Sequence, residues 1–167
     1  MTTTMTINDL LVEYGSLAEN KDQAPMRVGA RLIEEFFDSF RDYHLLDIEQ
    51  TANLLYYLTD IQVRDYALGL LNVKDTDALE HSLNYLLDSA PKSSEYSNAP
   101  AVLLAVLEFE CGNTKAAIRT LSHASEDYSL AQLLRRVFVS GWKPEMFQQM
   151  RNELHESVTE NIFGEGN

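Results

Sequence analysis

Apolar residues recur three and four positions apart along most of the chain, which is the spacing of one face of an α-helix. The longest such series begins after Pro25 and consists of Val28, Leu32, Ile33, Phe36, Phe37, Phe40 and Tyr43. Charged residues fall on or beside the opposite face of the same segment: Arg27, Arg31, Glu34, Glu35, Asp38 and Arg41. This pattern predicts a helix with one packed side and one side in water.

Helix start signals divide the rest of the chain in the same way. Asp47 with Gln50 three residues later predicts a capping box, and Asp60 predicts a second cap soon after it. Helices are therefore expected at about 8–18, from 25 onward, and at 47–58, 60–71, 76–90, 98–111, 114–124, 129–139 and 144–160. No segment alternates apolar and polar residues as a half-buried strand does. We expect an all-α array of about nine helices in a single domain, residues 1–167, with a disordered tail at about 161–167.

Residues 101–107 read AVLLAVL, and this segment is apolar on every side. Periodicity alone fits a buried strand as well as a buried helix. Asn98 as a cap, Pro100 in the first turn and Gly112 at the end favour a central, buried helix. The preceding segment, 91–99, is rich in Pro, Ser and Asn, and we expect a mobile loop there.

One pair of predicted helices has the small and large apolar positions of a tetratricopeptide-type helix pair. The matching residues are Ala101, Leu104, Ala105, Gly112, Ala117, Leu121 and Ala124. No second copy follows at the repeat period of about 34 residues. The sequence thus indicates one tetratricopeptide-like pair without a repeat array.

The same region resembles a known family. The segments that carry the resemblance are Asp60–Asp65, Pro100–Ala105, Gly112-Asn113, Asp127–Ala131 and Gly141-x-x-Pro144. Through them, residues 47–144 resemble the C-terminal half of an actinobacterial family known as domain of unknown function four-one-nine-two. The resemblance implies an actinobacterial, phage or plasmid origin and a helical module without established catalytic residues. The longer N-terminal half of that family, with an apolar segment around a Gly-Phe pair, has no counterpart here.

Charge and cysteine content restrict the classes of function. The chain has 26 Asp and Glu against 13 Lys and Arg, a net charge of −13, so we expect no direct binding to nucleic acid. Cys111 is the one cysteine, which excludes an internal disulfide and fits a reducing compartment. No apolar run approaches the roughly 18 residues of a membrane span. We therefore expect a cytoplasmic protein that does not enter a membrane.

Motifs for catalysis are missing from the sequence. It contains no glycine-rich phosphate loop, no nucleophile elbow, no HExxH and no CxxC. We therefore predict no catalytic, cofactor-binding or metal-binding residues and no cofactor. Cys111 is expected to be a packed thiol at the end of a buried helix. Acidic groups such as Glu34, Glu35 and Asp38 are expected to form solvated helix faces.

A candidate surface for a partner or an anion comes from the less acidic part of the chain. Residues 1–96 hold 17 acids and 7 bases, whereas residues 97–167 hold 9 and 6. Lys115, Arg119, Arg135 and Arg136 predict a local anion-binding patch. We expect Arg64 and Asp65 to form a structural ion pair or cap, with a ligand contact as the alternative. We expect Tyr128 to be an exposed aromatic residue that contacts a partner.

The leading hypothesis is a non-enzymatic module that binds another protein through an exposed helix groove. One alternative is an acidic decoy for a nucleic-acid-binding protein, and another is a helical enzyme with an unrecognised site. In the last helix, the stripe of Phe147, Met150, Leu154 and Val158 is expected to face the core. Self-association through that helix into a homo-oligomer is left open.

Overall fold

The computed structural model describes residues 4–17, 23–42 and 46–164, and within these ranges it contains nine α-helices and no strand. The α-helices are α1 Ile7–Leu17, α2 Gln23–Arg41, α3 Ile48–Tyr57, α4 Ile61–Leu70, α5 Thr76–Ser89, α6 Asn98–Glu110, α7 Thr114–Leu121, α8 Ser129–Val139 and α9 Pro144–Phe163. Two short 3₁₀ helices, η1 Val73–Asp75 and η2 Glu95–Ser97, precede α5 and α6. The predicted all-α class is confirmed. Ala18 and Tyr43, which the predicted helices included, lie outside the described residues.

Side-chain caps fix where α3 and α4 begin. Asp47 accepts a hydrogen bond from the Gln50 backbone N–H at 2.8 Å, and the Gln50 side chain accepts from the Asp47 N–H at 3.1 Å. Asp60 accepts from the N–H groups of Gln62 and Val63. These bonds satisfy N–H groups that have no partner within the helix. Both predicted caps are confirmed, and they allow the chain to turn within 58–60.

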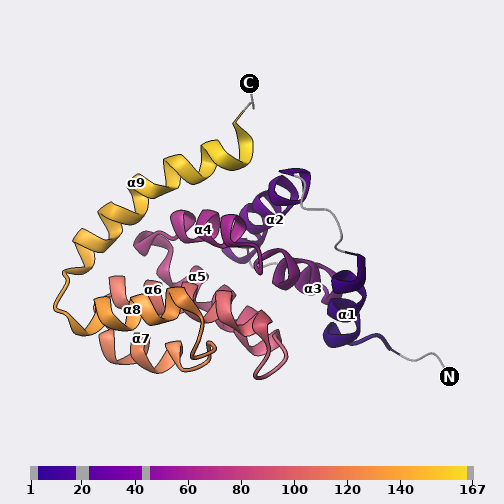
Figure 1. The fold of residues 1–167 in the computed structure, drawn as a ribbon, viewed down its shortest axis with the longest axis horizontal. Coiled ribbons are helices and arrows are strands. Elements are labelled where there is room, and N and C mark those ends of the chain that lie inside the picture. The colour runs from indigo at the N-terminus through magenta and orange to yellow at the C-terminus, as the bar shows by residue number, and fades with distance from the viewer. Residues whose placement is uncertain (1–3, 18–22, 43–45, 165–167) are drawn as a thin grey trace.

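Helix α6 is the centre of the fold. Its buried residues are Ala99 through Leu107 and Phe109, so it is covered on all sides. It packs against α4, α5, α7, α8 and α9. Figure 1 shows α7 and α8 on one side of α6, with α9 arching past it on the other. The expected central helix is confirmed, and its apolar residues are needed on every face because neighbours surround it.

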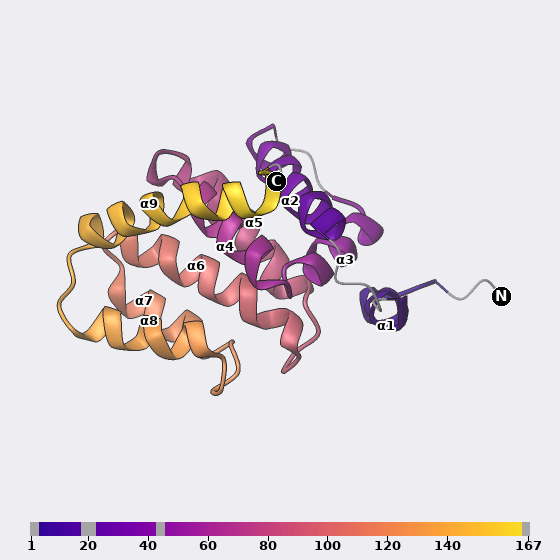
Figure 2. The same ribbon diagram turned by 45° about the horizontal axis from the view of Figure 1, so that its top comes forward.

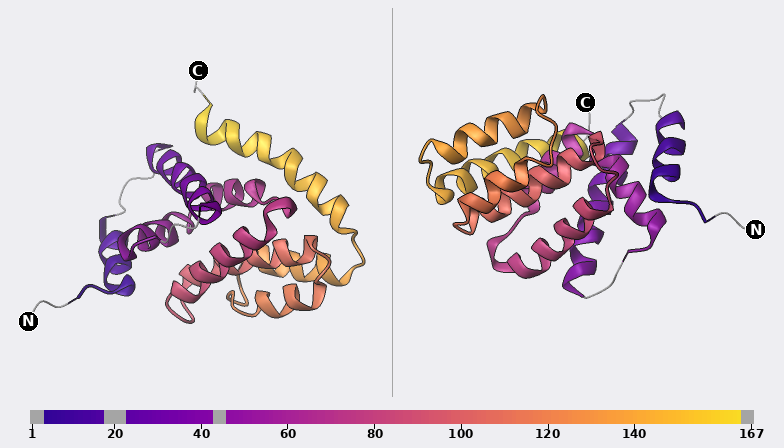
Figure 3. Two further views of the ribbon diagram at one scale, coloured as in Figure 1. Left: turned by 180° about the vertical axis from the view of Figure 1, so that it is seen from behind. Right: turned by 90° about the horizontal axis from the view of Figure 1, so that it is seen from below.

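Helices α1, α2 and α3 pack on one another and, through α2, on α4, α5 and α9. Helix α9 crosses α4 and also contacts α2 and α6, as the turned view in Figure 2 shows. Helix α1 lies at one end of the molecule and packs against α3, which is clearest in Figure 3. Gly112 makes the turn between α6 and α7 with a φ of 86°, a left-handed conformation that glycine adopts without strain. No helix in the described part of the chain is long and apolar enough to cross a membrane.

Three expectations about the helix ends and faces were wrong. Asn98 is the first residue of α6 and not its cap, which is Ser97, and the Asn98 side-chain carbonyl accepts a hydrogen bond from the Ser125 N–H. Helix α9 continues to Phe163 with Ile162 buried, so the predicted tail began too early; residues 165–167 lie outside the described ranges. Leu154 is 57% exposed and does not face the core.

The inner face of α9 differs from the predicted stripe because it carries polar residues. Its fully buried residues are Phe147, Arg151 and Ile162, and His155 is half-buried between the first and last of these. Arg151 and His155 occupy inward positions because they contact groups on the helices beneath. A pattern that counts only apolar residues therefore places the face incorrectly.

Candidate binding groove

A groove runs between the end of α5 with the segment after it and the connection from α7 to α8. Its volume is about 850 Å³. One wall contains residues from Asn84 on α5 to Asn98 at the start of α6, and the other contains residues from Thr120 to Asp127. We call this the α5–α8 groove. It is more than twice as large as a depression of about 390 Å³ on the flank of α9.

The α5–α8 groove has an apolar floor and a charged rim. Leu87, Ala90, Leu104 and Ala124 provide apolar surface at the base, and the last three of these are buried. Charged side chains line the rim: Asp88, Lys92, Glu95, Glu126 and Asp127. Serine, threonine and asparagine side chains also line the groove. The combination of apolar surface with a few polar groups is typical of binding clefts.

The wall formed by residues 120–127 is held by hydrogen bonds to helices α6 and α8. The Asn98 side chain accepts from the Ser125 N–H at 2.7 Å. From α8, Gln132 donates to the Glu126 carbonyl at 2.8 Å, and Arg135 donates to the Leu121 carbonyl at 3.1 Å. The wall is therefore fixed before any ligand binds.

Arg64, Asp65 and Tyr128 come together at the end of this wall. Arg64 donates to Asp65 Oδ1 through Nε at 2.9 Å and Nη2 at 2.7 Å, and to the Tyr128 hydroxyl through Nη1 at 2.9 Å. Its guanidinium also lies 5.6 Å from the centre of the Tyr128 ring. Arg64 is only 7% exposed, so these contacts join α4 to the start of α8 in the interior. Arg64 and Asp65 thus form an ion pair in the structure, and a ligand contact by these residues stays a prediction.

The predicted cationic patch is only partly assembled. Lys115 and Arg119 are exposed on α7, and Arg136 is exposed on α8. Arg135 is half-buried, and its Nη2 is engaged by the Leu121 carbonyl. Three of the four side chains thus remain available to solvent, and an anion site there stays a prediction.

The opposite wall coincides with the segment expected to be a mobile loop. The Pro91 carbonyl accepts hydrogen bonds from Ser94 and from the Ser97 hydroxyl, and Ser97 is buried. The segment contains η2, and α6 begins at Asn98, so the irregular part is shorter than 91–99. Its mobility stays a prediction.

A buried ion pair beneath α9 was not foreseen from the sequence. Arg151 Nη2 lies 2.9 Å from Glu110 Oε1, and Arg151 Nη1 donates to the Leu68 carbonyl at 2.6 Å. Burial raises the pKa of Glu110 against the opposing effect of Arg151. Arg151 follows Phe147 by four residues and therefore lies on the same side of α9. This spacing is the feature of the sequence that could have indicated a buried arginine.

A second polar cluster joins α2, α4 and α9. Tyr66 donates its hydroxyl to Glu34, and the His155 ring packs on the Tyr66 ring at 5.1 Å between centroids. Burial, and then the charge of Arg151, lower the pKa of His155, whereas Glu34 acts in the opposite direction. Burial and Glu34 raise the pKa of Tyr66. Glu34 was expected only as part of a solvated face, but its carboxylate has a specific partner.

Two further expectations concern reactive and metal-binding groups. Cys111 is exposed, with its Sγ 3.5 Å from the Thr76 hydroxyl, so the expected packed thiol was wrong. The cysteine follows the last helical residue of α6 and lies outside its buried stretch. Among the described residues, no three His, Cys, Asp or Glu side chains converge as a metal site would require.

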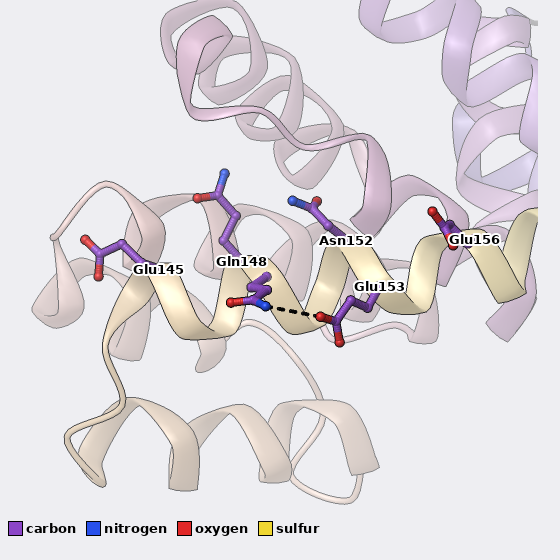
Figure 4. Close-up of a pocket in the computed structure, with 6 residues that line it drawn as sticks. Glu145, Gln148, Asn152, Glu153 and Glu156 are labelled. Atoms are coloured by element: carbon purple, nitrogen blue, oxygen red, sulfur yellow. Dashed lines mark hydrogen bonds between the residues drawn. The ribbon is translucent and has the colours of Figure 1, made fainter.

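The flank of α9 presents a shallow acidic depression of about 390 Å³. Glu145, Glu153 and Glu156 line it together with Gln148, Gln149 and Asn152 (Figure 4). Gln149 donates to Glu153 at 3.2 Å. All six residues come from one helix, so this surface is open and lacks a second wall.

The described helices form an all-α fold with a polar-rimmed groove between α5 and the connection from α7 to α8. Residues 7–145 match the model of the family described as domain of unknown function (DUF4192), and the chain belongs to this family. The match extends the expected resemblance of 47–144 to include α1 and α2. No curated protein and no solved structure matches the chain.

Proposed function

We propose that the protein is a non-enzymatic, helical protein-interaction module that binds a segment of another protein in the α5–α8 groove. The observation that carries this proposal is the groove itself, with its volume of about 850 Å³ and two walls from separate parts of the chain. An apolar floor flanked by polar groups is suited to a partner's side chains. The hydrogen bonds that hold the wall of residues 120–127 reduce the ordering that binding would require.

The polar groups of the groove support a binding role over catalysis. Ser125 donates its hydroxyl to Asp127, so the serine is not paired with His123. Among the described residues that line the groove, no hydrogen bond connects His123 to a serine or carboxylate. Activation of a nucleophile needs a base within hydrogen-bond reach. This arrangement supports a recognition role for the groove.

A steric block tests this function. Asn84 is exposed on α5 and lines the groove, so Asn84→Trp is expected to fill part of it. Peptides of about twelve residues, selected from a random library on the native protein, are expected to bind the variant at least about tenfold more weakly in fluorescence anisotropy. Asn152→Trp, at an exposed site on α9, is the control and should retain binding. Equal binding to both variants would contradict the proposal.

A second candidate function is the acidic decoy for a nucleic-acid-binding protein. The observation in its favour is the line of Glu145, Glu153 and Glu156 along α9. A decoy would attract cationic partners through this flank. Binding of polylysine would test this candidate. If Gln at these three positions weakens the binding and Asn84→Trp does not affect it, the result favours the decoy over the groove.

Finer features of the protein are also part of this proposal. Helices α6 and α7, joined at Gly112, would form a tetratricopeptide-like pair, supported by the burial of Ala105, Ala117 and Leu121. The proposed setting is the cytoplasm of an actinobacterium or of its phage or plasmid. The proposed partner is another protein, without direct contact to nucleic acid or a membrane. Met146 and Leu154, each 57% exposed on α9, are the proposed contacts for any homo-oligomer.

A further inference from the structure

We infer that the segment bound in the α5–α8 groove is basic, with lysine or arginine side chains that pair with the two rims. This inference rests on the proposed function and specifies the chemistry of the partner. Three features of the groove support it: the charge of the rims, their separation into two walls and the apolar floor between them.

The rims of the groove carry an excess of negative charge. Asp88 and Glu95 lie on the α5 side, and Glu126 and Asp127 lie on the opposite side. Lys92 is the one Lys or Arg among the lining residues. All four carboxylates belong to exposed residues, so a ligand reaches them without rearrangement. Complementary charge steers association and selects among partners.

The distribution of these carboxylates favours a chain with several positive charges over a single metal ion. A divalent cation needs several oxygen ligands within about 2.6 Å. No three of the described acidic or His side chains converge in this way. Carboxylates on two walls instead fit separate cationic groups along one extended segment.

The floor of the groove fits the aliphatic parts of such side chains. Lysine and arginine place three or four methylene groups along apolar surface while the charged end reaches polar groups. Leu87 and Ala124 provide apolar surface below the acidic rims. An acidic segment would meet repulsion at both rims, and a purely apolar one would leave the rims without partners.

The test uses a fluorescein-labelled peptide of alternating arginine and alanine, about ten residues long, in anisotropy titrations. The groove variant carries Asp88→Asn, Glu95→Gln and Glu126→Gln. The matched control carries Glu145→Gln, Glu153→Gln and Glu156→Gln on α9, so both variants have the same net charge. We expect affinity for the peptide to fall about tenfold in the groove variant and less than about threefold in the control. Raising salt from about 50 to about 300 mM should reduce this difference.

The outcomes separate this inference from the proposed function. Equal losses in the two variants would overturn the inference, because the peptide would then respond only to overall charge. A larger loss in the α9 variant would overturn it in favour of the acidic decoy. If library peptides blocked by Asn84→Trp are neutral or acidic, the inference fails while the groove remains a protein-binding site. If basic peptides bind the Asn84→Trp protein unchanged, both fail.

Discussion

Arg151 and Glu110 are almost completely removed from water, with side-chain exposures of 2% and 1%. Arg151 uses two of its nitrogens on Glu110 Oε1 and a third on the Leu68 carbonyl. Glu110 Oε2 is buried and has no hydrogen-bond partner within the described structure. A charge in such an environment depends strongly on its one partner, since water cannot replace it.

Replacing Arg151 with methionine should therefore destabilise the fold strongly. The Arg151→Met variant keeps most of the apolar stem but leaves Glu110 buried without a counter-charge. We expect the free energy of unfolding to fall by about 3–5 kcal/mol, measured by urea denaturation. The double variant Arg151→Met with Glu110→Gln should regain part of this loss. Equal destabilisation of the single and double variants would show that packing, and not charge, sets the effect.

His155 lies in the same region and has a buried Nδ1 without a partner in the described structure. Tyr66 faces its ring, Arg151 lies on the same helix, and Glu34 approaches from α2. The pKa of His155 is lowered from its ordinary value of 6.5, first by burial and then by Arg151. The folded protein therefore favours the neutral imidazole.

Stability should thus decrease as the pH falls through the ordinary pKa of histidine. Below 6.5 the unfolded chain binds a proton at His155 that the folded chain does not yet bind, so unfolding is favoured until the folded-state pKa is reached. Urea midpoints measured between about pH 7.5 and 5 should fall more steeply for the native protein than for His155→Gln. The raised pKa of Glu110 has the opposite effect on stability at lower pH. Both proteins contain Glu110, so its effect cancels in the comparison. Parallel curves would contradict this assignment.

Helices α4 and α9 approach each other closely at Gly69. A Cβ at this position would overlap the His155 ring and lie 2.7 Å from the His155 Cβ. The His155 Cβ is fixed to the backbone of α9, so it cannot move away as a flexible side-chain end would. The absence of a side chain at Gly69 thus sets the distance between the two helices.

Alanine at Gly69 should force these helices apart. We expect Gly69→Ala to lower the free energy of unfolding by about 1–3 kcal/mol, although alanine favours a helix. Gly15→Ala in α1 is the control, because nothing lies within 4 Å of a Cβ there. The control should be unchanged or more stable by up to about 1 kcal/mol in thermal unfolding. A stabilised Gly69→Ala variant would show that α9 is loosely held.

Most helices were predictable because local signals mark them. The Asp47 and Asp60 caps, the apolar run in α6 and the Gly112 turn each depend on residues close in sequence. The inner face of α9 was not predictable in this way. It is decided by contacts of Arg151 and His155 with helices far away along the chain, and an apolar pattern carries no information on such pairs.

The candidate site was predictable only in its parts. Arg64, Asp65 and Tyr128 were recognisable as polar residues of interest, but their meeting joins positions 64 residues apart. The α5–α8 groove arises from the packing of α5, α6 and α7, so no motif indicates it. Its rim residues appear in the sequence as ordinary solvent-exposed charge.

At the scale of the whole molecule, the family match and the packed core end at different places. The match stops at residue 145, whereas α9 continues to Phe163. Helix α9 buries Phe147 and Ile162, and the Ile162 carbonyl accepts a hydrogen bond from Arg27 of α2 at 2.9 Å. The last helix is therefore part of the core that α2, α4 and α6 build.

A chain that ends at residue 145 should consequently lose its cooperative fold, although it retains every residue matched to the family. Removal of α9 exposes the apolar surfaces of α4 and α6 and leaves Glu110 without Arg151. We expect loss of the thermal transition in circular dichroism and increased binding of a hydrophobic dye. A chain that ends at residue 163 is the control, because it lacks only the segment after α9. It should unfold as the full chain does. If the chain that ends at residue 145 kept an unchanged thermal transition, α1 to α8 would fold independently, and α9 would only pack on a domain that is already folded.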